Sequence, residues 1–435
     1  MTAEPTESSR SLLARIESRD LRVGVVGLGY VGLPVACAFA DAGFDVVGVD
    51  VDGDRVAAIN SGVTPIGGTE PGLAELLAAV VASGKLVATT DHAQLGNADI
   101  VTLNVQTPVG EDNQPSYTAL EAACTAIGPV LETGAVVIVE STVSPGTTVG
   151  LVTPLLEKGS GGREGVDFHV GACPERVMPG RLLENIRTVA RVCGAERSEI
   201  AELMRAFYRT VVGAEIDVTT TTTAELVKVT ENAYRDVQIA FANEVATICE
   251  DLGIDVWEVR DLVNKVPFRD MHRPGGGVGG HCIPKDPWLL AAAAKSAEPR
   301  LIPAARAIND GMPLHVAEVV EDALRAHRRE RGLPLDTPAR VSVLGVSYLA
   351  GSDDTRNSPS LALIDELTKR GHEVRSHDPH VPGHGGPVAE MLDGAEAVVL
   401  MVHHSEYADV RPDSPVFVDA ERLGEARASS SGMVS

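Results

Sequence analysis

A glycine-rich turn between a short hydrophobic run and an apolar helical stretch is the feature that most constrains the fold of this chain. Residues 22–27 are typical of a β-strand, the motif GLGYVG then places glycines at Gly27, Gly29 and Gly32, and residues 33–42 continue as an apolar helix. In such a unit the first glycine makes the turn, the second lets a pyrophosphate approach the backbone, and the third permits close packing of helix on strand. The pattern predicts a dinucleotide-binding βαβ unit, against the alternative of a purely structural glycine turn.

Side chains near this turn indicate which dinucleotide is bound. Asp50 ends the second predicted strand, residues 44–50, about 20 residues after the turn. A carboxylate there accepts hydrogen bonds from the adenosine ribose and repels a 2′-phosphate, so we expect NAD rather than NADP. Arg55 can pack against the adenine or reach the phosphates, and a solvated helix residue is the equal alternative. Within the turn itself, Tyr30 and Val31 are also expected to contact the cofactor.

Further strands follow the first two. Runs at 99–105 and 135–140 alternate with helical stretches, which predicts an α/β fold with a doubly wound parallel sheet. Ligands of open α/β sheets bind at the carboxyl ends of the strands, and Thr107 and Thr142 follow these two runs. Both threonines are candidate neighbours of the cofactor or substrate, the alternative being that their hydroxyls cap the following helices.

The length of the chain requires more than one core. At 435 residues we expect two or three domains. Residues 223–252 form one helical stretch without Gly or Pro, which suits a linker that also forms a subunit interface, although a plain core helix is the equal alternative. A polar linker at 330–338 precedes a second strand–turn–helix at 340–346. We therefore expect two Rossmann-like, doubly wound parallel-sheet domains joined by a long central helix. The expected division is an N-terminal tail at 1–20 leading into a short helix, an NAD-binding domain at 21–215, a central helical domain at 216–330, a C-terminal α/β domain at 339–425 and a disordered tail at 426–435.

The charge and cysteine content exclude several classes of partner. The formal net charge is -24 at pH 7, whereas nucleic acids and anionic membranes require a basic surface. Apolar runs are broken well before the ~20 residues that a membrane span needs. Six cysteines are scattered without metal-ligand spacing, so we expect no metal site. With no signal peptide ahead of them, we expect a reducing cytoplasm.

A second glycine-dense segment, PGGGVGGHCIPKDPW at 274–288, carries a cysteine. Cys282 lies among backbone N–H groups that no side chain shields, with Lys285 and Asp286 close behind. A thiol in such surroundings can ionise and attack a carbonyl, but a lone glycine-rich loop with a buried cysteine is more often a flexible turn. Glu175 follows a strand-like run at 168–171 and is a candidate acid or base at the same edge of the sheet.

The motifs taken together resemble those of a known family, the nucleotide-sugar 6-dehydrogenases that include UDP-glucose dehydrogenase. The resemblance runs from about residue 21 to residue 419. Its motifs are GLGYVG, EST, CPERVMPG, AELVKVTENAYRDVQIAFANE, PGGGVGGHCIPKDPW and DDTRNSPS. Among subgroups, CPER, the VTEN helix and GVGGHC are most similar to the UDP-N-acetyl-D-mannosamine dehydrogenases, with the UDP-N-acetylglucosamine dehydrogenases close behind.

The resemblance implies an NAD-dependent, four-electron oxidation of a UDP-sugar at C6 to the carboxylate, without release of free aldehyde. Cys282 falls on the family's nucleophile, which forms a thiohemiacetal and then a thioester. Asp286 falls on an aspartate that holds a water or the lysine at the reacting centre. Lys228 and Asn232 fall on the family's lysine and asparagine, and their spacing of four places them on one helix face, where they would stabilise and orient the oxyanion. Glu175 matches the base proposed for thioester hydrolysis.

Substrate and cofactor contacts and a subunit interface are implied as well. We expect the C-terminal domain to bind UDP and the chain to form a homodimer through the central helix. Arg356 matches the residue that bridges the C-terminal domain and the cofactor. Arg269 is preferred over Arg273 as the arginine that reaches a neighbouring subunit's sugar nucleotide. The expected substrate-binding residues are Glu175, Arg176, Lys228, Asn232, Arg269, Gly275, Gly277, Gly279 and Tyr348.

Two departures from the family pattern bear on the substrate. Pro179 stands where UDP-glucose dehydrogenases have a second glutamate, which weakens glucose as the sugar. Leu349 stands where the family has a lysine on the substrate diphosphate side, so that charge must come from elsewhere. We expect a UDP-N-acetylhexosamine, with UDP-N-acetyl-D-mannosamine preferred over UDP-N-acetylglucosamine or UDP-glucose. The alternative hypotheses are a two-electron dehydrogenase of β-hydroxy acids and a catalytically weak nucleotide-sugar-binding protein.

Overall fold

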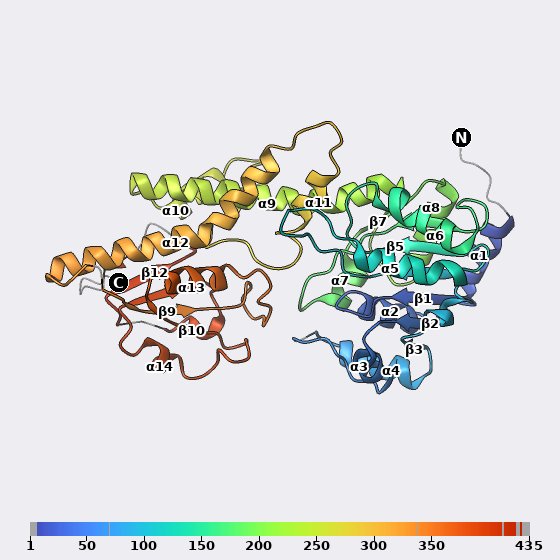
Figure 1. Ribbon diagram of the computed structural model, residues 1–435, viewed down its shortest axis with the longest axis horizontal. Coiled ribbons are helices and arrows are strands. Elements are labelled where there is room, and N and C mark those ends of the chain that lie inside the picture. Colours follow the sequence, from blue (N-terminus) through green and yellow to red (C-terminus); the bar gives the residue numbers. More distant parts are fainter. Residues whose placement is uncertain (1–6, 69, 336, 411–412, 423–426, 429–435) are drawn as a thin grey trace. The chain divides into compact units, whose positions relative to one another are not determined.

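The structure, a computed structural model, describes residues 7–68, 70–335, 337–410, 413–422 and 427–428 (Figure 1). Two compact units make up the chain, and each is described by itself. The first unit comprises Met1–Glu231 and Trp288–Ala297, and the second comprises Asn232–Pro287 and Glu298–Ser435. Helix α9 (Thr221–Leu252) begins in the first unit and ends in the second. None of the described helices is apolar over a length that could traverse a bilayer.

The first unit is built on an eight-stranded sheet in the order β3-β2-β1-β4-β5-β6-β7-β8. Its strand pairs are parallel except for β6 and β7, which are antiparallel. Strand β5 has Val136 and Ile138 in the core on one face and Val137 and Val139 in the core on the other. Burial on both faces is what the continuous apolar run of this strand predicts for a sheet covered by helices on both sides. The strands are β1 (Arg22–Val26), β2 (Asp45–Val49), β3 (Leu86–Thr89), β4 (Ile100–Leu103), β5 (Val136–Val139), β6 (His169–Ala172), β7 (Arg191–Ala195) and β8 (Ile216–Thr219).

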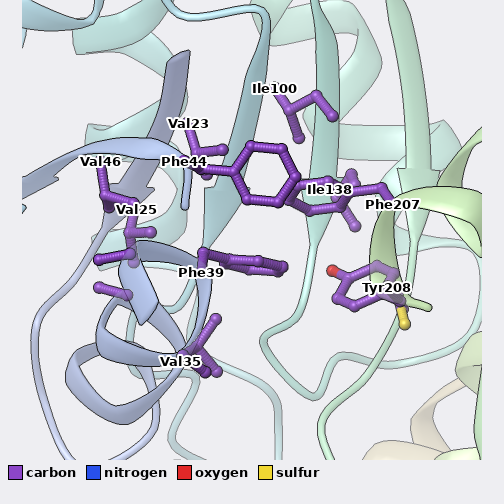
Figure 2. Close-up of a cluster of buried hydrophobic side chains, with 14 of the residues drawn as sticks. Val23, Val25, Val35, Phe39, Phe44, Val46, Ile100, Ile138, Phe207 and Tyr208 are labelled. Carbon is purple, nitrogen blue, oxygen red and sulfur yellow. The ribbon is translucent and has the colours of Figure 1, made fainter. Parts of the chain in front are cut away.

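Aromatic packing stabilises one face of this sheet (Figure 2). Phe39 and Phe207 stack with ring centroids 4.3 Å apart, and Phe44 and Tyr208 flank them. Helix α1 adds two buried residues, Leu12 and Ile16, to the same core, so the short helix expected near the N-terminus is packed against the first unit. The helical segments of this unit are α1 (Glu7–Ser18), α2 (Gly32–Asp41), α3 (Gly53–Asn60), α4 (Leu73–Ala82), η1 (His92–Leu95), α5 (Thr118–Ile127), η2 (Gly128–Val130), η3 (Thr148–Val152), α6 (Thr153–Ser160), α7 (Leu182–Thr188) and α8 (Ser198–Tyr208).

The second unit contains a five-stranded sheet in the order β10-β9-β11-β12-β13. The strands are parallel except for β12 and β13. Helix α12 buries Val316, Val320 and Leu324 in a core shared with β9, β11 and β12. The remaining elements are α10 (Val256–Val263), α11 (Asp286–Ala292), which crosses between the units, α12 (Leu301–Arg331), β9 (Arg340–Leu344), α13 (Pro359–Lys369), β10 (Glu373–His377), α14 (Val388–Leu392), β11 (Ala397–Leu400), η4 (Ser405–Tyr407), β12 (Val416–Asp419) and β13 (Arg427–Ala428).

The alternating α/β architecture with two Rossmann-like sheets and a long central helix confirms the predicted fold class. Strands β3, β7 and β8 were not among the expected elements; β3 and β8 have exposed residues and therefore lack a continuous apolar run, and β7 begins with an arginine. Helix α12 was also missed, since Pro313 lies inside its 31 residues and proline is normally a helix breaker. The expected disordered tail at 426–435 lies outside the described residues, except for Arg427–Ala428, which pair with β12.

Candidate active site

The three glycines of the GLGYVG turn are required by three different geometries. Gly27 has φ +89, and a Cβ there would lie 2.6 Å from the carbonyl oxygen of Asn104. At Gly32 a Cβ would lie 1.8 Å from the carbonyl oxygen of Gly27, so this glycine permits the close approach of helix α2. Gly29 differs, because no atom lies within 4 Å of its Cβ position. The turn is therefore packed at its base and open at Gly29, which fits the approach of a dinucleotide pyrophosphate to the backbone.

Asp50 follows the second strand of this unit and is buried. Its carboxylate accepts hydrogen bonds from the backbone N–H groups of Leu28 at 2.8 Å and Asp52 at 3.0 Å. Arg55 Nη1 lies 3.1 Å from the same carboxylate. The structure thus places Arg55 on Asp50, whereas contact of Arg55 with the adenine or the phosphates stays a prediction.

Tyr30 connects the cofactor turn to a distant loop through Glu70. The Tyr30 hydroxyl donates to the Glu70 carboxylate, which also accepts from the backbone N–H groups of Gly180 at 2.7 Å and Leu182 at 3.2 Å. Val31 is the N-cap residue of α2. A single carboxylate therefore holds the GLGYVG turn and the end of the CPERVMPG loop together.

The two threonines expected at strand ends are brought into contact. Thr107, after β4, donates its hydroxyl to the carbonyl oxygen of Thr142, after β5, at 2.6 Å. The loop beyond Thr142 is held by Glu225 on α9, which accepts from the N–H groups of Gly146 at 2.6 Å and Thr148 at 2.8 Å. Burial raises the pKa of Glu225. The carboxyl ends of β4 and β5 are thereby fixed to the helix that carries the predicted lysine.

Glu175 lies in a buried cluster of charged and polar groups at the ends of β5, β6 and β7. Its carboxylate is ion-paired with Arg191, whose guanidinium also lies 4.9 Å from the ring centroid of Tyr208. The Tyr208 hydroxyl donates to Glu140, a second fully buried carboxyl group. Burial raises the pKa of Glu140 to about 7, although Arg191 opposes the shift. The Arg191 guanidinium therefore interacts electrostatically with both carboxyl groups. The raised pKa means that Glu140 gains or loses its proton near neutral pH.

Arg176 and Lys228 are associated with helix α9. The guanidinium of Arg176 forms a two-pronged ion pair with Glu231 on α9, with Nε 3.1 Å from one carboxylate oxygen. Arg176 Nη1 also donates to the carbonyl oxygen of Ala190 at 2.5 Å. Lys228 is half-buried on the same helix. Contact of Arg176 and Lys228 with a substrate stays a prediction.

Cys282 lies in the second unit, at the start of a short turn that is closed by backbone hydrogen bonds. The carbonyl oxygen of Cys282 accepts from the N–H groups of Lys285 at 3.2 Å and Asp286 at 2.9 Å. The buried Asp286 carboxylate accepts from Asn232 Nδ2 at 2.5 Å and forms an ion pair with Lys285 Nζ at 2.9 Å. All six cysteines belong to the described part of the chain, and five are buried whereas Cys282 is exposed. The structure thus brings Asn232, Asp286 and the Cys282 turn together.

Glycines of the cysteine loop lie against neighbouring protein. A Cβ at Gly279 would lie 2.3 Å from Tyr348 Cβ, and one at Gly277, where φ is +130, would lie 3.0 Å from Pro359. Gly275 is open, with no atom within 4 Å of its Cβ position. The loop therefore needs glycine to pass Tyr348 and Pro359, and contact of these glycines and of Tyr348 with a sugar stays a prediction.

Two arginines expected near ligands have different surroundings. Arg356 forms a two-pronged ion pair with Asp354, with Nε 3.0 Å from Oδ1 and Nη2 2.6 Å from Oδ2. The hydrogen bond to Asp354 raises the pKa of Arg356, and the Arg356 carbonyl oxygen accepts from the N–H of Gly280 at 2.8 Å. Arg269 and Arg273 are both exposed, and Arg273 lies 6.0 Å from the ring centroid of Trp257. The preference for Arg269 as the residue that reaches a neighbouring subunit's sugar nucleotide stays a prediction.

Three potential metal ligands, His380, His404 and Glu406, lie with their ligand atoms within 4.8 Å of one another among the described residues. Both nitrogens of His404 are already engaged, because Nδ1 accepts from the N–H of Gly351 at 3.1 Å and Nε2 lies 3.1 Å from Asp378. A metal ion would have to break one of these buried contacts. We therefore assign no ion to this group.

Several residues that shape the site were not predicted. The sequence contains a clue to Lys285, which directly precedes Asp286, and to Glu140, which is an acidic residue at the end of a predicted strand. Arg191 and Glu70 carry no local signal, because each looks like a surface charge until its partner is known. Tertiary structure alone reveals their roles.

Comparisons with known proteins cover nearly the whole chain. The NAD-binding domain of the UDP-glucose/GDP-mannose dehydrogenase family matches residues 21–212, the central domain of that family matches 222–311, and its UDP-binding domain matches 342–424. A UDP-N-acetyl-D-mannosamine dehydrogenase of Pyrococcus horikoshii is 41% identical over 91% of this chain and 92% of its own length. An NDP-N-acetyl-D-galactosaminuronic acid dehydrogenase of Ralstonia solanacearum is 36% identical over 93% of this chain and 96% of its own length. Among solved structures, the UDP-D-ManNAc dehydrogenase of P. horikoshii matches with a TM-score of 0.86 at 39% identity, covering 93% of this chain and 96% of that one.

Proposed function

The chain belongs to the UDP-glucose/GDP-mannose dehydrogenase family and is an NAD-dependent oxidoreductase, and from this premise we propose its reaction. It oxidises the C6 hydroxymethyl group of a UDP-N-acetylhexosamine to the carboxylate, with UDP-N-acetyl-D-mannosamine preferred. Residues 21–215 hold NAD, residues 216–330 carry the cysteine loop and the subunit contact, and residues 339–425 hold the UDP moiety.

Two observations support an N-acetylated sugar. The relatives from P. horikoshii and R. solanacearum are both named for N-acetylated sugars. Pro179 occupies the position at which the resemblance to UDP-glucose dehydrogenases would require a second glutamate. UDP-N-acetylglucosamine and UDP-glucose are the alternative substrates. Selection among them depends on how the sugar pocket contacts the substituent at C2.

The observation that carries the proposed chemistry is the exposed Cys282 at the start of a turn that ends at Asp286, whose carboxylate is held by Asn232 and Lys285. NAD, when held at the GLGYVG turn and Asp50, would supply the hydride acceptor for each of two oxidations at C6. Between them the Cys282 sulfur adds to the C6 aldehyde to give a thiohemiacetal, and the second oxidation leaves a thioester. Water then attacks the thioester, which releases the carboxylate and restores the thiol. For each sugar, one water is consumed and three protons are released, and the covalent link prevents loss of the aldehyde.

Other residues of the chain orient the groups that react. Lys228 stabilises the developing oxyanion and assists removal of the C6 hydroxyl proton, and Asn232 orients the oxyanion. Asp286 is held by Asn232 at 2.5 Å and by Lys285 at 2.9 Å, which supports a role in fixing a water or a lysine at the reacting carbon. Glu175 accepts the proton of the hydrolytic water. Its ion pair with Arg191 fixes the direction of that carboxylate.

Counting NADH per sugar tests this proposal. Purified protein is incubated with UDP-ManNAc, UDP-GlcNAc, UDP-glucose, UDP-galactose and GDP-mannose, and we expect two NADH for each UDP-ManNAc consumed. A yield of one NADH would favour a two-electron dehydrogenase, and binding without NADH would favour a nucleotide-sugar-binding protein. Cys282→Ser should abolish uronate formation and leave NAD affinity intact. Unchanged turnover by that variant would refute the thioester route.

We also propose that two copies associate through α9. Tyr234, Phe241, Ile248 and Leu252 recur every seven or four residues on this helix, and each is between 51% and 65% exposed. An apolar stripe of this length is expected to be covered in solution. A second copy of the chain fits, because identical stripes are complementary across a two-fold axis. The scattered placement of the six cysteines in the sequence supports the expectation of a cytoplasmic location.

A further inference from the structure

The cysteine loop is attached to helix α9 at its first glycine. The backbone N–H of Gly275 donates to the side-chain oxygen of Asn243 at 2.9 Å. Asn243 is fully buried on α9, and Gly275 precedes Cys282 by seven residues. Because no atom lies within 4 Å of the Cβ position of Gly275, packing does not restrain this glycine on that side. The hydrogen bond to Asn243 therefore helps to fix where the loop begins, together with the packing of Gly276 against Met401 and Ala420.

A chain of buried polar groups fixes the orientation of Asn243. Arg306 Nη1 donates to Asp236 Oδ1 at 2.6 Å, and Asn309 Nδ2 donates to the same oxygen at 2.8 Å. With its nitrogen on the carboxylate, Asn309 presents its oxygen to Asn243 Nδ2 at 2.9 Å. That leaves the Asn243 oxygen directed at Gly275. Each of the four residues is at most 1% exposed, and a connected buried network of this kind is rigid.

Beyond this anchor the loop is held by packing of Gly277 on Pro359 and of Gly279 on Tyr348. A cavity of about 240 Å³ lies beside it, lined by Val278 and Pro284 of the loop and by Asn309, Pro313 and Pro359 among others. The anchor at Gly275 and these later contacts therefore set the position of Cys282 together, and the cavity leaves room for the loop to shift when the anchor is removed.

We propose that Asn243 is a positioning residue for the nucleophilic thiol. The ion pair of Arg306 with Asp236 sets the direction of the Asn309 amide, the Asn309 amide sets that of Asn243, and Asn243 holds Gly275 and hence the loop that carries Cys282. This inference rests on the proposed role of Cys282 as nucleophile. Misplacement of a reacting group by about 1 Å can slow a step by about 100-fold. The attack on the aldehyde, which needs the thiol, is the step that depends on this anchor.

Two substitutions of Asn243 test the inference. Asn243→Leu keeps the volume of the side chain but removes the acceptor for Gly275 and the donor to Asn309. Asn243→Asp in its protonated form keeps one acceptor and one donor in the same places, beside Asp236, Arg306 and Asp310 as the charged neighbours. For each variant, NADH per UDP-ManNAc, aldehyde trapped with hydroxylamine, NAD affinity and the rate of Cys282 alkylation by iodoacetamide are measured.

In Asn243→Leu we expect the NADH yield to fall from two towards one, trapped aldehyde to appear and NAD affinity to stay within twofold. Asn243→Asp should recover a yield near two at pH 6, because its protonated form keeps both the acceptor for Gly275 and the donor to Asn309. A yield of two with a wild-type alkylation rate in Asn243→Leu would overturn the inference, as would equal losses in both variants at pH 6. If Asn243→Leu does not bind NAD, Asn243→Ser takes its place, since a smaller polar residue is tolerated more easily at a buried site.

Failure of the proposed function would look different from failure of this inference. Absence of NADH from the wild-type protein with every UDP-sugar would reject the reaction, and the alkylation rates would still report whether Asn243 sets the position of Cys282.

Discussion

Replacing Glu140 by glutamine should make the first unit less sensitive to rising pH. Glu140 is fully buried beside Arg191 and Tyr208, and burial raises its pKa from 4.5 to about 7. Since the folded-state pKa is the higher one, the stability contributed by the protonated carboxyl group is complete below pH 4.5 and is lost as the pH rises through 7. Glutamine keeps a side-chain oxygen for the Tyr208 hydroxyl and does not titrate.

The size of the effect follows from the two pKa values. A difference of 2.5 units corresponds to roughly 3 kcal/mol of folding free energy at 1.36 kcal/mol per unit. Most of this loss, roughly 2.5 kcal/mol, falls between pH 5 and pH 8. For a unit of this length it corresponds to a change of roughly 5 to 10 °C in melting temperature. The wild-type protein should therefore lose that much more thermal stability than Glu140→Gln over the same pH range.

Differential scanning calorimetry at pH 5, 6, 7 and 8 measures the difference. The transition that moves upward when NAD is added is assigned to the first unit, because ligand binding stabilises the unit that binds it. Glu121→Gln is the control, since Glu121 is an exposed carboxyl group on α5 of the same unit. If wild type and Glu140→Gln lose stability in parallel from pH 5 to pH 8, the raised pKa of Glu140 is wrong.

Three further predictions concern the cofactor turn and the subunit contact. Gly29→Ala should keep the wild-type melting temperature and weaken NAD binding at least about tenfold, because its Cβ fits the free protein and occupies the space needed by the pyrophosphate. Gly32→Ala should lower both properties, because its Cβ would lie 1.8 Å from a backbone oxygen; equal calorimetric effects of the two variants would contradict this. Asp50→Asn should raise the use of NADP relative to NAD by about tenfold in kcat/KM, since Arg55 is released from its ion pair; an unchanged ratio would show that Asp50 does not select the cofactor. Phe241→Asp should convert a dimer into a monomer in light scattering while NAD binding persists, and a monomeric wild type would reject the α9 contact.

Much of the fold could be predicted because its signals are local. The apolar run of β5, the glycines of the first turn and the uninterrupted helix at 223–252 each specify their own conformation within a few residues. Strand β7 could not be predicted in the same way. It begins with Arg191, a charged residue that is buried where it forms an ion pair with Glu175.

The residues of the candidate site also differ in whether a local motif or only the folded structure identifies them. Cys282, Lys228 and Asn232 were predicted from motifs, and the structure brings Asn232 to Asp286 at 2.5 Å. Their catalytic roles stay predictions. Lys285 was missed as a partner of Asp286, because the direction of its side chain depends on how the turn after Cys282 folds.

By itself the sequence determined the α/β class, the dinucleotide turn with Asp50 and the presence of a cysteine in a glycine loop, since each depends on neighbours within a short segment. Only the tertiary structure decided which buried charges share a partner and what holds the loop in place. Glu140 and Glu175 both interact with Arg191. Asn243 on α9 accepts a hydrogen bond from Gly275 of the cysteine loop, 32 residues later in the sequence. Desolvation and hydrogen bonding act through space, so the pKa of a carboxyl group and the position of a thiol are set by the groups that folding brings together.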